Sequence, residues 1–113
     1  MQVASMLKDL KFDDKKPAIL ILLDNSYSKE IRIAFRELQE MKEHKAPFPI
    51  SVEVFRGEIE FGVNDEIVTL KDGDIITLDA NIPHSLIAKK ESIVRLSLNK
   101  SDNINRVSAV LNN

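Results

Sequence analysis

The sequence contains no cysteine, and it has three glycines and four prolines among its 113 residues. Without cysteine the chain forms no disulfide, holds no metal through a thiolate and has no thiol nucleophile. So few glycines and prolines exclude a collagen-like or low-complexity chain. The glycines are also too dispersed for the glycine-rich loop that cradles a phosphate group. With 43% hydrophobic and 30% charged residues, the composition is that of an ordinary globular domain.

Long hydrophobic runs and an excess of charge of one sign are also missing. The longest apolar run, residues 18–23, is much shorter than the roughly 20 residues of a membrane-spanning helix. Residues 1–12 lack the apolar stretch of a signal peptide, so we expect a cytoplasmic protein without membrane insertion. Sixteen basic and eighteen acidic residues give a net charge of −2. Because no face is obviously basic, we expect no nucleic-acid partner.

Short segments with alternating polar and apolar residues fill the middle of the chain. Residues 30–35, 50–55 and 58–63 have the pattern of half-buried β-strands. Asn64 and Asp65 tolerate the positive φ of a two-residue hairpin loop. Strands separated by such turn signals predict an all-β sandwich or barrel. The expected core consists of the inward-facing residues Ile33, Val52, Val54, Ile59, Phe61, Val63, Ile76, Leu78, Leu86, Leu96 and Leu98.

Two segments favour a helix by local composition. Residues 35–43 are good helix formers with apolar residues three apart, and their propensity alone predicts a helix. Residues 101–113 also place apolar residues at helical spacing, behind Ser101 and Asp102, whose residue types cap helices. We predict a short C-terminal helix in this tail, whereas residues 35–43 are ambiguous on these patterns.

Two motifs in the second half of the chain resemble those of the cupins. Residues 44–47 and 50–61 are similar to the first cupin motif, in which a strand ends at a glycine turn before a second strand. Residues 73–88 are similar to the second motif, which opens with glycine-aspartate and closes a turn with proline-histidine. The spacer, residues 62–72, also has a suitable length. From residue 30 to 98 the chain therefore resembles a small single-domain cupin of the RmlC-like, cupin 2 type.

The resemblance implies one domain over residues 1–113, with a double-stranded β-helix (jelly-roll) barrel over about residues 18–98. In that fold residues 35–43 form a strand end and a turn, and tertiary context often overrides helix propensity. Small cupins are typically homodimers, so a homodimer is implied here as well. Phe55 and Ile93 are expected to be outward-facing apolar residues that a partner could cover.

The resemblance also identifies where a cupin metal site would lie. Metal-binding cupins use two histidines and a glutamate from the first motif and one histidine from the second. These positions correspond here to His44, Ala46, Ile50 and His84, so two of the usual ligands are missing. Glu53 is no substitute, because it points to the opposite face of its strand from Ile50. Since catalytic metals generally need three protein ligands, we expect no cofactor, or a divalent metal held weakly by His44 and His84.

Three further residues have specific expectations. Asp79 and Asn81 replace the proline and glycine that are usual in the second motif. Asn81 suits the turn because asparagine tolerates the left-handed conformation, whereas Asp79 is no evident metal ligand. Arg95 lies between two apolar residues. It either reaches solvent or a subunit interface, which we favour, or carries a buried ion pair.

The candidate pocket at the barrel mouth comprises His44, Ile50, Val52, His84 and Leu86. Apolar walls with two imidazoles suit a binding pocket, so the preferred hypothesis is a non-catalytic or weakly catalytic cupin that binds an unknown small ligand. The alternative is a metal-dependent enzyme of the dioxygenase or isomerase type that uses the two histidines. A third hypothesis is a structural homodimer with a vestigial pocket. No residue is assigned a catalytic role.

Overall fold

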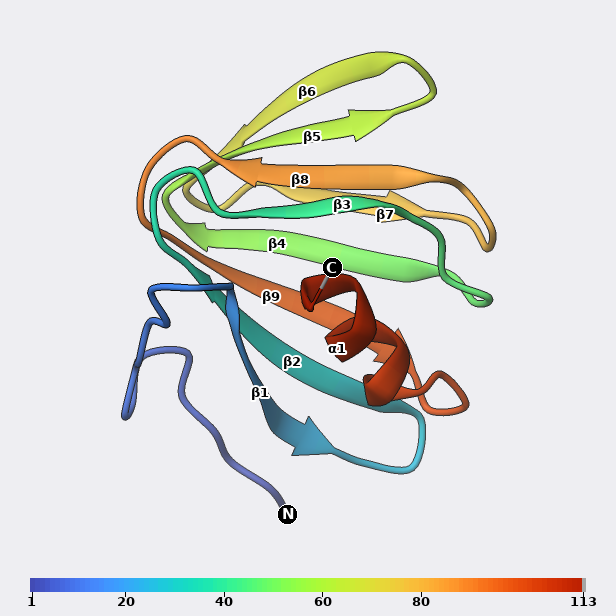
Figure 1. Cartoon of the computed structure of the whole chain (residues 1–113). Coiled ribbons are helices and arrows are strands. Elements are labelled where there is room, and N and C mark those ends of the chain that lie inside the picture. The colour runs from blue at the N-terminus through green and yellow to red at the C-terminus, as the bar shows by residue number, and fades with distance from the viewer. Residues whose placement is uncertain (113) are drawn as a thin grey trace.

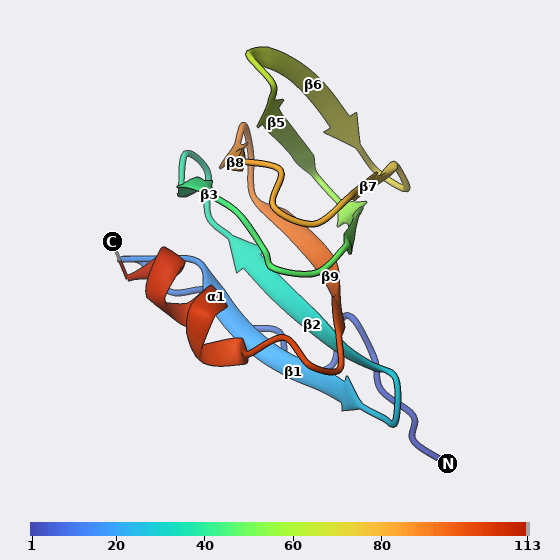
Figure 2. The ribbon, with the colours of Figure 1, turned by 90° about the vertical axis from the view of Figure 1, so that its right-hand side faces the viewer.

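The computed structural model describes residues 1–112, and this part of the chain forms nine strands and one helix (Figure 1). The elements are β1 (Ala18–Asp24), β2 (Ser28–Phe35), β3 (Glu40–His44), β4 (Ile50–Arg56), β5 (Glu58–Val63), β6 (Glu66–Lys71), β7 (Ile75–Leu78), β8 (His84–Ala88), β9 (Ser92–Asn99) and α1 (Ile104–Leu111). Five strands form one sheet in the order β1-β2-β9-β4-β7, and four form a second in the order β3-β8-β5-β6. In both ribbon views β1 and β6 lie at opposite margins of the molecule (Figures 1 and 2).

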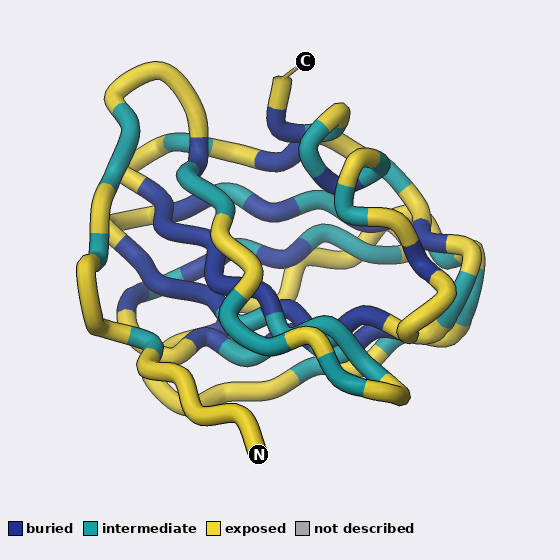
Figure 3. The backbone as a smooth tube through the Cα atoms, turned by 90° about the horizontal axis from the view of Figure 1, so that it is seen from below, coloured by how far each residue is buried: buried dark blue, intermediate teal, exposed yellow. Residues whose placement is uncertain are grey.

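The core lies between the inner faces of the two sheets. β2 pairs antiparallel with β9 along its whole length, and its alternate residues Ile31, Ile33 and Phe35 are buried in the core. Figure 3 shows buried segments within the strands and exposed segments mainly in the turns. All expected core residues are buried except Val63, Ile76 and Leu78, which pack against the core and are partly buried. The prediction of an all-β fold with a core of alternating strand residues is confirmed.

Several turns depend on left-handed backbone conformations. Asn64 and Asp65 have φ values of 50° and 62° and join β5 to β6, as predicted, because this turn geometry matches the twist of the strands. Asn81, between β7 and β8, has the predicted left-handed conformation with φ 66°. Gly57 has φ +116°, and a Cβ there would lie 2.2 Å from the Ser92 hydroxyl oxygen. The turn from β4 to β5 therefore requires glycine.

Residues 35–43 form no helix. β2 ends at Phe35, a turn follows, and β3 begins at Glu40. In the turn Leu38 has φ 70°, and its N–H donates to the Ala88 carbonyl at 2.8 Å. Met41 then enters the core from β3. Burial of Met41 and pairing of β3 with β8 thus override the local helix propensity. The strand end and turn that the cupin resemblance implies for residues 35–43 are confirmed.

Residues 1–17 pack on the outer face of the five-stranded sheet. Arg32, on this face of β2, is buried, and its guanidinium donates to the backbone carbonyls of three residues in the N-terminal segment. Ile93 lies beside Ala34 of β2 and is only 3% exposed. Ile93 alternates with the core residue Val94 and so points to the outer face as expected, but it is buried within the chain and is not open to a partner. Phe55 remains exposed.

Arg95 forms ion pairs with two carboxylates on the same outer face. Its guanidinium lies 2.7 Å from Glu30 on β2 and 3.0 Å from Glu53 on β4. Burial raises the pKa of Glu30, but hydrogen bonds from Ser97, Ser28 and Arg95 outweigh burial and hold that pKa below its ordinary value. Arg95 thus combines features of our two alternatives, because its side chain is 36% exposed and also takes part in ion pairs. The partly buried ion pair forms because carboxylates on both neighbouring strands flank Arg95.

The predicted C-terminal helix is present as α1, but its cap differs from the predicted one. Asn103 is the N-cap residue, and its side-chain oxygen accepts the N–H of Asn105 at 2.8 Å. Neither Ser101 nor Asp102 caps the helix. Asp102 is buried, and its carboxylate accepts the N–H of Asn103 at 2.7 Å and binds the guanidinium of Arg106 in the first turn of the helix.

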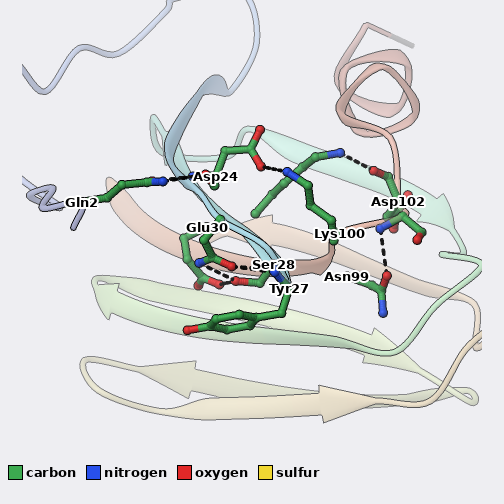
Figure 4. Close-up of polar contacts among 11 residues, drawn as sticks. Gln2, Asp24, Tyr27, Ser28, Glu30, Asn99, Lys100 and Asp102 are labelled. Carbon is green, nitrogen blue, oxygen red and sulfur yellow. Dashed lines mark hydrogen bonds and ion pairs between the residues drawn. The ribbon is translucent and has the colours of Figure 1, made fainter.

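The loop between β9 and α1 is anchored to the β1–β2 hairpin (Figure 4). Lys100 forms an ion pair with Asp24 at the end of β1. Lys29 of β2 donates to the backbone carbonyl of Asp102. These contacts fix the direction in which α1 leaves the sheet. No helix within residues 1–112 is long and apolar enough to cross a membrane.

Candidate functional site

The four positions matched to cupin metal ligands surround one cavity between the sheets. His44 ends β3, Ala46 follows in the next loop, Ile50 begins β4 and His84 begins β8. His44 and His84 are direct cross-strand neighbours in the pairing of β3 with β8. Their ring centroids are 4.3 Å apart, and the rings are tilted by 60°. The prediction that the two histidines lie together, despite 40 intervening positions in sequence, is confirmed.

The cavity is small and mostly apolar. All five residues of the predicted pocket line it, and the full lining consists of Ile33, Met41, His44, Ala46, Ile50, Val52, His84, Leu86, Val94, Leu96, Arg106 and Val107. The volume open to water is about 20 Å³, which is room for one water molecule. His84 is itself buried, and its ring stacks on Phe61 with the centroids 5.6 Å apart.

Backbone carbonyls fix the orientation of both imidazoles. His44 Nδ1 lies 2.7 Å from the Lys42 carbonyl oxygen, and His84 Nδ1 lies 2.8 Å from the Ile82 carbonyl oxygen. Because a carbonyl oxygen only accepts, each Nδ1 must carry a proton and donate it. In the neutral rings the Nε2 atoms are then acceptors. Among residues 1–112 no protein group donates to either Nε2, so these lone pairs are available to an occupant of the cavity.

The environment of the histidine pair favours the neutral form of both rings. Burial lowers the pKa of His44 to about 4, and the nearby His84 and Arg106 add to this effect. Burial also lowers the pKa of His84, again with a contribution from Arg106. The hydrogen bonds to Lys42 and Ile82 act in the opposite direction but are outweighed. At neutral pH the site therefore presents two uncharged nitrogen acceptors.

Arg106 is a site residue that the sequence analysis missed. It projects from α1 to the cavity, and its guanidinium binds both carboxylate oxygens of Asp102 at 2.9 Å. It also donates to the Lys45 carbonyl at 3.4 Å, next to the loop that carries Ala46. The i, i+4 spacing of Asp102 and Arg106 in a predicted helix indicates an ion pair. Nothing in the sequence, however, places that helix over the cavity.

The donor set does not fit a resident catalytic metal. Within residues 1–112 there is no group of three or more histidine, aspartate or glutamate side chains arranged to hold a metal ion. Glu53 points to the outer face, where it binds Arg95, and Asp79 is exposed. Two neutral imidazoles supply neither the third ligand nor the negative charge that such an ion needs, and the Arg106 guanidinium lies nearby.

Comparisons with known proteins identify the fold. No protein-family model matches the sequence, and no curated protein matches it. The structure is similar to that of an RmlC-like cupin protein from Desulfovibrio desulfuricans, with TM-score 0.78 and 20% identity over 88% of this chain and 97% of that chain. A protein with a double-stranded beta-helix domain from Klebsiella pneumoniae gives TM-score 0.78 and 19% identity, covering 91% of this chain and 94% of that chain. KdgF from Halomonas sp. gives TM-score 0.63 and 16% identity, covering 70% and 74%. The chain thus has the fold of a small cupin.

Proposed function

We propose that this protein is a non-catalytic cupin that binds a small molecule at the barrel mouth through His44 and His84. The observation that carries the proposal is the pair of neutral imidazoles whose Nε2 lone pairs are left free beside an apolar cavity. Ile50 occupies the position of the metal-binding carboxylate and makes that wall apolar. An apolar cavity with a few fixed polar groups is the usual architecture of a small-molecule site.

The ligand should carry hydrogen-bond donors. Two acceptor nitrogens are best satisfied by hydroxyl or N–H groups, because a ligand that covers these acceptors without donating to them would remove their hydrogen bonds to water at a cost in free energy. The space in this structure suffices for one water molecule, so a larger ligand must displace part of the lining. Arg106 and Val107 are the lining residues that α1 contributes. We therefore expect α1 to shift when a ligand larger than water enters.

The second candidate is a metal-dependent enzyme of the dioxygenase or isomerase type that uses the same two histidines. One observation favours it, namely that both Nδ1 atoms donate to backbone carbonyls. Metal-bound histidines commonly have this arrangement, since it directs Nε2 to the ion. The missing third ligand and the nearby Arg106 argue against it. The binding function is the better-supported proposal, and we retain the sequence-based prediction of a cytoplasmic location.

A fragment screen by protein NMR tests the binding function. We expect small alcohols or amides to shift the backbone amide signals of Leu86 and Val107, which line the cavity from β8 and α1. His44→Phe and His84→Phe keep an aromatic ring but remove the acceptor, and each should weaken such binding about tenfold, the loss of one hydrogen bond. If no fragment affects these signals, or if both variants bind as well as the wild type, the proposal is wrong.

A further inference from the structure

β6 is an edge strand with exposed apolar side chains. It pairs with β5 and with no other strand of residues 1–112, and it lies at the margin of the molecule in both ribbon views (Figures 1 and 2). Ile67 on its outer face is 70% exposed, and Val68 on its inner face is 37% exposed. An unprotected edge of this kind is a template for pairing with another strand.

The register of the β5–β6 hairpin shows which backbone groups point away from β5. Val63 and Glu66 flank the two-residue turn and therefore form its first hydrogen-bonded pair. Hydrogen-bonding direction alternates along an antiparallel strand. The N–H and C=O groups of Ile67, Thr69 and Lys71 are consequently directed to the free edge.

Lys71 does not contribute to this free edge, because the turn before β7 uses its backbone groups. The Lys71 N–H donates to the Asp74 carboxylate, and the Lys71 carbonyl accepts the Asp74 N–H, both at 2.8 Å. The groups that β6 offers to a partner are thus those of Ile67 and Thr69. Val68 lies between these two residues. A two-fold axis through Val68 would therefore place Ile67 of one copy opposite Thr69 of a second copy.

We propose that β6 pairs antiparallel with β6 of a second copy of this chain, with Val68 of both copies facing each other at a two-fold axis. In this register Ile67 of each copy lies opposite Thr69 of the other. Every outward N–H and C=O group of the two residues then has a partner across the interface. The two Val68 side chains cover one another on the inner face, and the four-stranded sheets of the two copies become one continuous sheet.

The charged residues at the two ends of β6 favour this register over a shifted one. They also favour a second copy of the chain as the partner, because the two ends carry opposite charges. Asp65, in the turn just before β6, comes opposite Lys71 of the second copy, and the symmetry repeats this attraction. A shift of the register by two residues toward the β7 end would instead place Glu66 opposite Asp72 of the second copy. Opposite charges across a strand pair stabilise it, whereas like charges destabilise it.

The dimer should depend on protein concentration. A single pair of short strands buries less than the ~1,600 Å² of a standard stable interface. We therefore expect monomer and dimer to exchange at micromolar concentration.

Cysteine cross-linking tests the register directly, because the natural chain has no cysteine. Cross-strand neighbours at a non-hydrogen-bonded position are close enough for a disulfide. Under mild oxidation Val68→Cys should form covalent dimers about tenfold faster than Thr69→Cys, whose symmetry mates lie beyond the ~7 Å limit between Cα atoms. Ile75→Cys, on the exposed edge strand β7, reports random collisions. If Val68→Cys cross-links no faster than Ile75→Cys, or if Thr69→Cys cross-links fastest, the proposal is wrong.

Sedimentation equilibrium of two matched lysine variants gives an independent test. Ile67→Lys introduces a charge at the proposed interface and should raise the dimer dissociation constant about tenfold or more. Ile75→Lys changes a residue of similar exposure, 62% against 70%, and should leave that constant unchanged. A wild-type protein that stays monomeric at high micromolar concentration, or a larger effect of Ile75→Lys than of Ile67→Lys, would contradict pairing through β6.

Discussion

Two backbone carbonyl oxygens determine the chemistry of the histidine pair. Because the carbonyls of Lys42 and Ile82 accept the Nδ1 protons, both rings are fixed in one tautomer with Nε2 as an acceptor. Their burial keeps these rings neutral. The ring centroids of His44 and His84 are only 4.3 Å apart. If both rings were protonated, they would repel each other and the nearby Arg106 guanidinium.

Acidification should destabilise the protein through His44. Its pKa is about 4 in the folded protein, compared with about 6.5 in an unfolded chain. The unfolded chain binds the proton more readily, so the free energy of unfolding should fall as the pH decreases from about 6.5 to about 4. Above that range His44 contributes no pH dependence. Imidazole NMR signals give the titration midpoint of His44, and urea unfolding at pH 7 and pH 5 gives the stability.

His44→Gln provides the control for this prediction, because glutamine does not titrate. The variant should lose less stability than the wild type between pH 7 and pH 5. A His44 midpoint near 6.5, or an equal loss of stability in both proteins, would show that the ring is not held neutral by burial.

Core residues of the central strands should be the most sensitive to truncation. Val54 and Phe61 are completely buried, so replacing either with alanine removes apolar contacts and leaves a cavity. We expect a loss of roughly 2–4 kcal/mol in the free energy of urea unfolding for each. Val68→Ala, at a partly exposed position of the neighbouring strand, should cost clearly less. Equal costs at all three positions would mean that the strand register is wrong.

Among the elements, α1 depends on its N-cap. Asn103→Ala removes the side-chain acceptor of the Asn105 N–H and should lower the free energy of unfolding by about 1 kcal/mol. Asn105→Ala changes an exposed residue inside the helix, where alanine is the better helix former, and should not destabilise the protein. Thermal and urea unfolding of the two variants check the assignment. A larger loss in Asn105→Ala would contradict it.

The strands could be predicted from sequence because their alternation and their turn residues agree. In the β5–β6 hairpin, Asn64 and Asp65 supply the left-handed turn that the flanking alternation requires. Residues 35–43 show where local patterns fail, since Leu38 turns the chain and Met41 is recruited to the core by β8. Burial of Ile93 could not be predicted either, because strand alternation gives the direction of a side chain and not what covers it.

At the scale of the whole molecule, the candidate site was only partly predictable. The strand patterns do not place His44 beside His84, and their proximity was inferred from the two cupin-like motifs. Arg106 was missed because it lies in the C-terminal tail, outside both motifs, and its position depends on how α1 is anchored. The Asp102 and Lys29 contact that anchors this loop joins segments far apart in the sequence.

The shared fold leaves the activity open, because one scaffold hosts many functions. Solved structures with 16–20% identity match the arrangement of the strands and therefore show the fold alone. The residues at the candidate site then decide its chemistry. Ala46 and Ile50 at two of the metal-ligand positions are therefore the features from which the binding function is inferred.

Elemental analysis of the purified protein, expressed with iron, manganese and zinc in the medium, tests this central claim most directly. Two neutral imidazoles without a carboxylate hold a divalent ion poorly, so we predict less than about 0.1 of these metal ions per chain. About one metal ion per chain, lost in both His44→Ala and His84→Ala, would contradict the account. That result would favour the metal-dependent enzyme over the non-catalytic binding protein.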